Sequence, residues 1–204
     1  MKKSDFILAS GSPRRCEMLK AHGYCFKVSA PKTKESTGGG SMSPKVVALK
    51  NSRLKAVAAI KKSPGLVVLS ADTIVVLNKH ILGKPRNKKD SLKMLLKLNN
   101  KTHSVITAYT ILSARDPGHG GVKIKIVDEK AVESFVTFGD FSAAEYKYYV
   151  KTGEPKDKAG AYGIQGLGAR FIKEVIGSYT NIVGLPLFEV MRGLKKAGIK
   201  PRWR

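Results

Sequence analysis

The sequence contains little cysteine, and it has no apolar run long enough to cross a membrane. Its only cysteines, Cys16 and Cys25, form no C-x-x-C pair and no zinc-spaced set, which argues against a disulfide framework and a structural zinc site. We expect both to be buried thiols in a reducing compartment. The apolar patch after the first charged residues is too short for a signal peptide. The sequence therefore predicts a cytoplasmic protein without a membrane partner.

Several catalytic signatures are also absent. The sequence has no G-x-x-x-x-G-K-[ST] loop, which argues against a P-loop nucleotide hydrolase. Its four histidines show no H-E-x-x-H or other zinc pattern, and no Ser–His–Asp set stands out. With 42% hydrophobic and 26% charged residues, the composition is typical of a globular protein. A chain of 204 residues buries a sizeable core as one domain or as two small lobes.

Acidic residues are scarce relative to basic ones. The chain carries 38 Lys and Arg against 15 Asp and Glu, a formal net charge of +23. Such an excess favours polyanionic partners such as nucleic acid, an anionic membrane or nucleotide phosphates. Because the basic residues are spread along the chain, the pattern is more typical of a solvated surface than of a nucleic-acid module with one basic stripe.

The first informative stretch is FILASGSPRRCEML, which begins at Phe6. It predicts a buried strand, a tight turn and a helix that begins at Pro13, whose missing N–H suits the first helical position. The start of a helix attracts anions, and guanidinium groups suit phosphate oxygens. The plainer alternative, two solvated arginines, is less favoured because cations in a first helical turn oppose the helix dipole. The residues expected to bind phosphate here are Ser10, Ser12, Arg14 and Arg15.

The second informative stretch is LVVLSADTIVVL, from Leu66 to Leu77. Its β-branched, apolar residues predict a central strand, which Asp72 and Thr73 interrupt. A carboxylate in such a strand is costly unless it is paired, hydrogen-bonded or bound to a metal. Two explanations stay open for Asp72: a structural pairing with a nearby lysine, or a metal- and phosphate-binding role, which we favour.

The rest of the chain alternates between helices and strands. We expect further helices over 44–60, 88–98, 142–151 and 187–197. We expect further strands over 25–30, 102–112, 122–138 and 171–176. Loops are predicted over 31–44, 153–168 and 181–185. This order predicts an α/β or α+β domain around a mixed sheet, with polar glycine loops gathered at one cleft.

Four motifs are similar to those of a known family. They are SGSPRR-x-x-x-L, ADTIV, LGKP and DKAGAYGIQGLG, which begin at Ser10, Ala71, Leu82 and Asp157, and NIVGLP follows at Asn181. Together they resemble the Maf family of nucleoside triphosphate pyrophosphatases over nearly the whole chain. The resemblance implies an α/β, inosine-triphosphatase-like fold with a long mixed central sheet, flanking helices and a cleft between two lobes. All of 1–204 would then be a single domain.

The resemblance also implies a reaction, the hydrolysis of the α–β phosphoanhydride of a nucleotide to a monophosphate and pyrophosphate. In family terms Asp72 is the catalytic acid–base residue and shares a divalent ion, Mg²⁺ or Mn²⁺, with Glu35. Lys55 and Lys84 join the phosphate-binding residues of the first turn. The residues that match the branch acting on dTTP and UTP are Arg14, Thr73 and Gln165. An amide such as that of Gln165 both donates to and accepts from a pyrimidine edge.

Three matters stay open. The family's lysine in the helix before ADTIV matches Lys55 by residue and Arg53 by approximate spacing, and we prefer Lys55. Some relatives are linked to septum formation and cell-division arrest, so the alternative function is a basic nucleic-acid-binding or regulatory protein with a vestigial site, although nucleic acid is the less expected partner. The resemblance also suggests a homodimer, which nothing in the residues themselves indicates.

Overall fold

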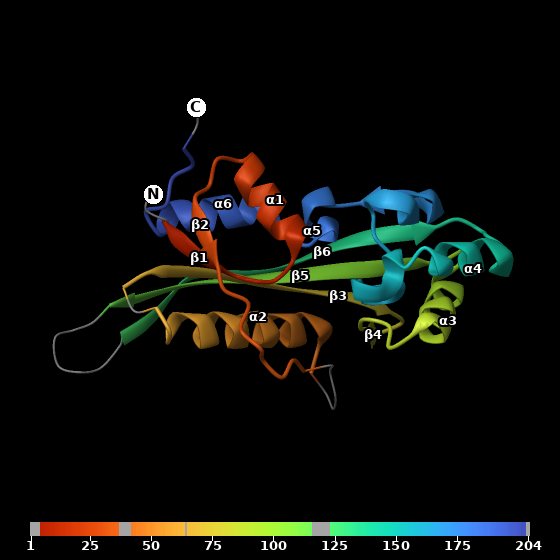
Figure 1. The fold of residues 1–204 in the computed structure, drawn as a ribbon, viewed down its shortest axis with the longest axis horizontal. Coiled ribbons are helices and arrows are strands. Elements are labelled where there is room, and N and C mark those ends of the chain that lie inside the picture. Colours follow the sequence, from red (N-terminus) through yellow and green to blue (C-terminus); the bar gives the residue numbers. More distant parts are fainter. Residues whose placement is uncertain (1–4, 37–41, 64, 116–122, 203–204) are drawn as a thin grey trace.

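The computed structural model describes residues 5–36, 42–63, 65–115 and 123–202. Seven strands form one mixed sheet in the order β2-β1-β3-β5-β6-β7, and β4 pairs with β3 off this path (Figure 1). The strands are β1 Phe6–Ala9, β2 Phe26–Val28, β3 Val67–Leu77, β4 His80–Leu82, β5 Thr102–Arg115, β6 Lys123–Phe138 and β7 Ile172–Ile176. β1 is parallel to β2 and β3, and the other pairs are antiparallel. The predicted mixed α/β architecture is confirmed.

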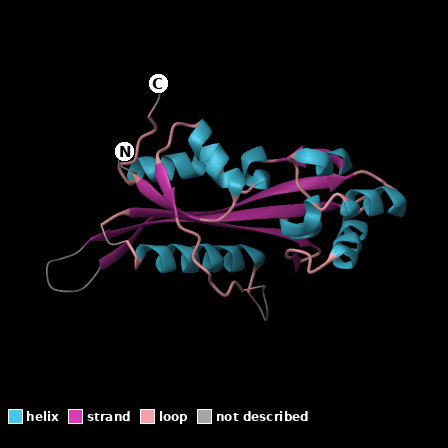
Figure 2. Cartoon of the chain, in the orientation of Figure 1, coloured by secondary structure: helices cyan, strands magenta, loops and turns pink. Residues whose placement is uncertain are grey.

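Helices cover both faces of this sheet. The α-helices are α1 Pro13–Ala21, α2 Pro44–Ile60, α3 Lys88–Leu98, α4 Ala143–Lys151, α5 Tyr179–Val183 and α6 Leu187–Lys196. Three 3₁₀ turns precede β7, namely η1 Glu154–Asp157, η2 Ala159–Ala161 and η3 Gly166–Phe171. Figure 2 shows α2 along one face of the sheet and α1 with α6 along the other.

The apolar run in β1 explains how these two layers are fixed. Phe6 and Leu8 pack with side chains of α1 and α6 on one face. Ile7 and Ala9 pack against α2 on the opposite face. Successive side chains of a strand point to opposite faces, so a strand that is apolar throughout is buried on both sides.

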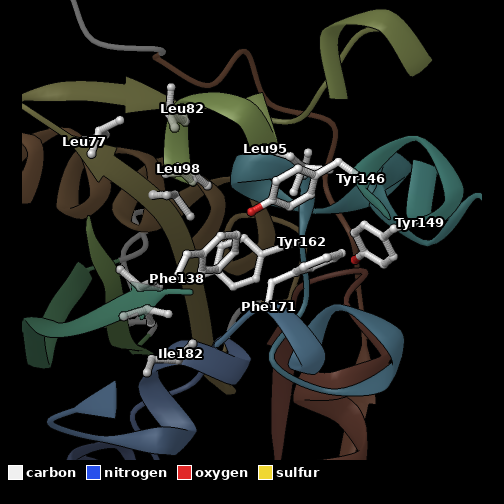
Figure 3. Close-up of a cluster of buried hydrophobic side chains, with 14 of the residues drawn as sticks. Leu77, Leu82, Leu95, Leu98, Phe138, Tyr146, Tyr149, Tyr162, Phe171 and Ile182 are labelled. Carbon is white, nitrogen blue, oxygen red and sulfur yellow. The ribbon is translucent and has the colours of Figure 1, made fainter. Parts of the chain in front are cut away.

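A second core lies at the far end of the sheet, around α3 and α4. Its centre is a group of aromatic rings that includes Phe138, Tyr162 and Phe171 (Figure 3). The rings of Phe138 and Tyr162 are 4.8 Å apart at an interplanar angle of 78°, an edge-to-face contact. Leu95 of α3 and Tyr146 of α4 pack onto the same group. The buried apolar side chains of the described residues thus form four clusters along one continuous sheet.

Several expectations about local structure are wrong. β3 continues through Asp72 and Thr73, which pair in register with β5, because their polar groups find partners in the fold. The predicted loop at 181–185 contains the end of α5, since the hydroxyl of Ser178 accepts from the N–H of Asn181 and caps that helix. Much of the glycine-rich segment is wound into the 3₁₀ turns. The strand expected over 122–138 is confirmed, since β6 is one long strand over Lys123–Phe138.

Three further features can be compared with the expectations from the sequence. Cys16 and Cys25 are only partly buried, so the expectation of buried thiols is wrong. A capping box formed by Ser142 and Glu145 begins α4, the helix expected over 142–151. Within the described ranges, no helix has the length and apolarity needed to cross a bilayer.

Candidate active site

A cavity of about 640 Å³ opens where the end of β1, the middle of β3 and the glycine-rich segment meet. The segment before Ser36, one side of α2 and the residues after β4 complete its walls. All the residues assigned to the site from the sequence line this one cavity: Ser10, Ser12, Arg14, Arg15, Glu35, Lys55, Asp72, Thr73, Lys84 and Gln165. The structure therefore brings the predicted residues together.

Asp72 lies in the middle of β3 and is 5% exposed. Its Oδ1 accepts a hydrogen bond from Nζ of Lys55 at 2.6 Å, and its Oδ2 accepts one from Nδ2 of Asn51 at 3.1 Å. Asn51 and Lys55 are four positions apart on α2, so both side chains lie on the helix face that meets β3. The pairing of Asp72 with a lysine is thus present, and the pair lies in the cavity.

Glu35 contacts the same ammonium group. Its Oε1 lies 2.9 Å from Nζ of Lys55, although half of the Glu35 side chain is exposed. Two carboxylates that touch one cationic nitrogen are close enough to share a divalent ion, and Mg²⁺ and Mn²⁺ prefer such oxygen ligands. Among the described residues no group of three His, Cys, Asp or Glu side chains is placed to hold a metal. An ion bound by this pair would complete its coordination with water and substrate oxygens, as Mg²⁺ commonly does.

Sequence reasoning missed Asn51. This residue is 2% exposed, and its amide forms two hydrogen bonds with the backbone of Ser36. The N–H of Ser36 donates to Oδ1 at 2.8 Å, and Nδ2 donates to the carbonyl oxygen of Ser36 at 2.9 Å. The one signal in the sequence is spacing, since Asn51 lies about one helical turn before Lys55.

Arg15 is 8% exposed and is held by the protein itself. Nε donates to the carbonyl of Gly184 at 2.7 Å, and Nη1 donates to Oγ of Ser10 at 2.8 Å and to the carbonyl of Ala71 at 2.9 Å. Nη2 donates to Oγ1 of Thr73 at 2.9 Å. Burial lowers the pKa of Arg15 to about 10, which leaves the group charged at neutral pH. The sequence suggested a guanidinium free to meet phosphate, whereas most of the donors of this one are already engaged.

Two further cations of the cavity, Arg14 and Lys84, have no such partners, whereas Lys158 pairs with Asp157. Arg14 and Lys84 form no hydrogen bond or ion pair with the rest of the described chain. The hydroxyl of Ser12 does not cap α1, although Ser12 occupies the N-cap position. Arg53, the alternative to Lys55, pairs with Glu129 of β6 at the surface and does not line the cavity. Of the two candidates, only Lys55 contacts the carboxylates.

Gln165 is exposed on the cavity wall, immediately before η3. The carboxylate of Glu154 holds this part of the chain by accepting from the N–H of Leu167 at 2.9 Å and from that of Gly168 at 3.1 Å. The hydroxyl of Tyr149 donates to the same carboxylate at 2.9 Å. These bonds fix the backbone two and three residues after Gln165.

A buried histidine supports the same wall from behind. Nε2 of His103 lies 2.7 Å from the hydroxyl of Tyr162, whose side chain lines the cavity. Burial lowers the pKa of His103 to about 4, so its ring is neutral at physiological pH. This contact joins β5 to the glycine-rich segment.

The sequence of this chain matches a known protein family. A family model described as "Maf-like protein" matches residues 5–197. The chain belongs to the Maf family. Relatives of this Maf-family chain named dTTP/UTP pyrophosphatase include one from Dictyoglomus thermophilum, 39% identical over 96% of this chain and 97% of its own. One from Pyrococcus abyssi is 41% identical over the same shares of the two chains.

A solved structure shows a distant likeness to this chain. The Ham1 protein of Staphylococcus aureus aligns with 97% of this chain and 91% of its own, at a TM-score of 0.44 and 15% identity. So distant a likeness adds nothing to the Maf assignment, which rests on the family model and on the full-length relatives.

Proposed function

We propose that this protein hydrolyses dTTP and UTP to the nucleoside monophosphate and pyrophosphate. One observation carries the proposal: a buried carboxylate, Asp72, lines the same cavity as two cations without a partner in the described chain, Arg14 and Lys84. The substrates are supported by the names of relatives that are 39% and 41% identical over nearly their whole length.

Arg14 and Lys84 are suited to the triphosphate because they line the cavity and neither forms a hydrogen bond or an ion pair with the described chain. Phosphoanhydride hydrolysis depends mainly on positioning and on neutralising charge, which two cations at one cavity supply. The hydroxyl of Ser12 and the start of α1 add hydrogen-bond donors for phosphate oxygens. Arg15 contributes its positive charge to the cavity but few hydrogen bonds to the substrate, since most of its donors bind the protein.

Glu35 and Asp72 fit a divalent ion, Mg²⁺ or Mn²⁺, because both carboxylates contact one ammonium nitrogen. When bound, such an ion supplies Lewis-acid polarisation of a phosphate oxygen and of a nearby water. The role of Asp72 is to accept a proton from that water at a carboxylate oxygen. Attack of the water on the α-phosphorus breaks the α–β anhydride bond, and the electron pair leaves with the pyrophosphate.

Gln165 and Thr73 are proposed to select the base. The Gln165 amide is exposed to the cavity and presents both a donor and an acceptor to a pyrimidine edge. The hydroxyl of Thr73 instead lies between Arg15 and Thr107, at 2.9 Å from each. Thr73 would therefore shape the floor of the cavity rather than reach the base.

The test is a panel of nucleoside triphosphates with Mg²⁺, with the products separated by ion-exchange chromatography. We expect dTTP and UTP to yield monophosphate and pyrophosphate. A diphosphate with orthophosphate, or no turnover, would contradict the proposal. Asp72→Asn should lower kcat by about 1,000-fold with an unchanged circular dichroism spectrum. Glu174→Gln also replaces a carboxylate by an amide, but at an exposed residue of β7, and it should leave kcat unaltered.

Two finer assignments belong to this proposal, a cytoplasmic location and a homodimeric state. Sedimentation velocity tests the second. The alternative, a nucleic-acid-binding or regulatory protein, is motivated by the net charge of +23. It predicts tight binding to DNA or RNA with a steep dependence on salt.

A further inference from the structure

Asn51 lines the cavity and contacts Asp72, yet the proposed reaction gives it no role. We propose that Asn51 is a positioning residue, whose amide holds the segment carrying Glu35 against Asp72 and so sets the separation of the two carboxylates. This inference rests on the proposed function for its kinetic consequences, and on the contacts of one buried side chain for its structural content.

Three of the four hydrogen bonds open to the Asn51 amide are formed, including both of its N–H groups. Its Oδ1 accepts from the N–H of Ser36, and its two N–H groups serve the carbonyl of Ser36 and Oδ2 of Asp72. The partners also define the orientation of the amide. If it were flipped, its oxygen would face a carbonyl and a carboxylate, and its NH₂ would face an N–H. Because the side chain is 2% exposed, water cannot replace the lost bonds cheaply.

The segment that carries Glu35 needs such an anchor. From Ser29 to Ser36 the chain forms neither helix nor strand. The ion pair of Glu35 with Lys55 is half-exposed on the glutamate side, and exposed pairs of this kind hold a chain weakly. The two bonds from Asn51 to Ser36 fix the backbone at the next residue, in the manner of a short strand pairing. Asn51 thus anchors the backbone of a segment that has no helix or strand of its own.

The contact with Asp72 has a second effect. Lys55 donates to Oδ1 and Asn51 donates to Oδ2, so each carboxylate oxygen has one partner on α2. Two donors from one rigid helix define the plane of the Asp72 carboxylate. One amide therefore joins the helix, the strand residue Asp72 and the Glu35 segment, and small errors in such geometry are costly for catalysis.

The first experiment measures kcat and KM for UTP with Mg²⁺. Asn51→Leu keeps the approximate size of the side chain and removes all three bonds. We expect kcat to fall by about ten-fold or more, whereas KM changes by less than about three-fold because the phosphate-binding cations are untouched. Asn51→Asp keeps an acceptor for the Ser36 N–H but places a second carboxylate beside Asp72. Its kcat should fall further than that of Asn51→Leu.

Ser52→Ala is the matched control. Ser52 is the next residue of α2, is fully buried, and hydrogen-bonds with Ser70 and Thr110 rather than with either carboxylate. This variant should lose thermal stability and keep kcat within about two-fold of the wild type. A folded Asn51→Leu protein with a kcat as close as that to the wild type would overturn the proposal.

The second experiment needs no nucleotide. Hydrogen exchange at the Ser36 amide should be about five-fold faster or more in Asn51→Leu than in the wild type or in Ser52→Ala, because the amide loses its acceptor. Unchanged exchange would overturn the proposal as well. If Asn51→Leu does not fold, Asn51→Asp is judged by its kcat. A wild type that hydrolyses no nucleotide would contradict the proposed function, and exchange at Ser36 would still decide whether Asn51 anchors the segment.

Discussion

Nζ of Lys55 lies 2.6 Å from Oδ1 of Asp72, and the two side chains keep only 13% and 6% of their exposure. Removal of the Lys55 charge would leave the Asp72 carboxylate buried without its ion-pair partner. The same ammonium also contacts Glu35, so three charged groups from three segments meet at one nitrogen. The stability of the protein and its proposed chemistry are therefore coupled at this point.

Lys55→Met should lower the free energy of unfolding by about 3 kcal/mol, because it strands the buried Asp72 carboxylate. Urea denaturation measures this loss, and kcat for UTP should fall by about 100-fold or more. Arg53→Met is the matched control on the same helix. Its exposed ion pair with Glu129 should contribute less than about 1 kcal/mol. Equal losses of stability in the two variants would show that the buried Lys55–Asp72 pair contributes no more than the exposed Arg53–Glu129 pair.

Arg15→Lys should destabilise the protein by about 2–3 kcal/mol, because one ammonium cannot reach all the acceptors that the guanidinium serves. Arg14→Lys should leave the free energy of unfolding within about 0.5 kcal/mol of the wild type. It should act instead through a higher KM for UTP, since Arg14 forms no hydrogen bond or ion pair with the described chain. Thermal unfolding and steady-state kinetics separate the two effects. The same response from both variants would argue against distinct roles.

Glu154→Gln should relax the choice of base. The amide cannot accept all three hydrogen bonds that the carboxylate accepts from Tyr149, Leu167 and Gly168. The wall that presents Gln165 should then be less fixed, and the ratio of kcat/KM for UTP over CTP should fall about ten-fold. Gln165→Ala should produce a fall of the same kind. A variant with unaltered selectivity would contradict this role of Glu154.

His103 predicts a loss of stability in mild acid. Its pKa is about 4 in the folded protein against an ordinary value of 6.5, with burial as the cause. Between these values the unfolded chain binds more protons, so the free energy of unfolding should fall as pH drops from 6.5 to 4. The full loss is on the order of 3 kcal/mol. Urea unfolding of the wild type and of His103→Gln across this pH range measures this loss. Because glutamine does not titrate, the difference in free energy of unfolding between the two proteins should shrink toward low pH.

Local elements could be predicted where short-range chemistry decides them. Pro13 and Pro44 each begin a helix as expected, and the helix over 88–98 is found with the same bounds. The continuous apolar run of β1 is enough to predict a buried strand. The ends of such elements depend on residues a few positions apart, which the sequence displays directly.

Contacts between distant segments could not be predicted in the same way. Nothing near Arg15 in the sequence reveals that its donors meet Gly184 and Ala71. Asp72 looked like an interruption because the partners that accommodate it lie on another element. The pairing of Asn51 with Ser36 likewise depends on how a segment outside regular structure crosses a helix. These features follow from tertiary packing, which a single sequence does not list.

The bond between Arg15 and Gly184 joins positions 169 residues apart in a chain of 204. Contacts of such high sequence separation form slowly, because most of the polypeptide must be ordered before its ends can meet. On the ribosome, Nε of Arg15 would lack this acceptor until almost all of the nascent chain had emerged. Assembly of the pocket is therefore a late event in the life of the polypeptide, and a chain cut short before Gly184 would lack its floor.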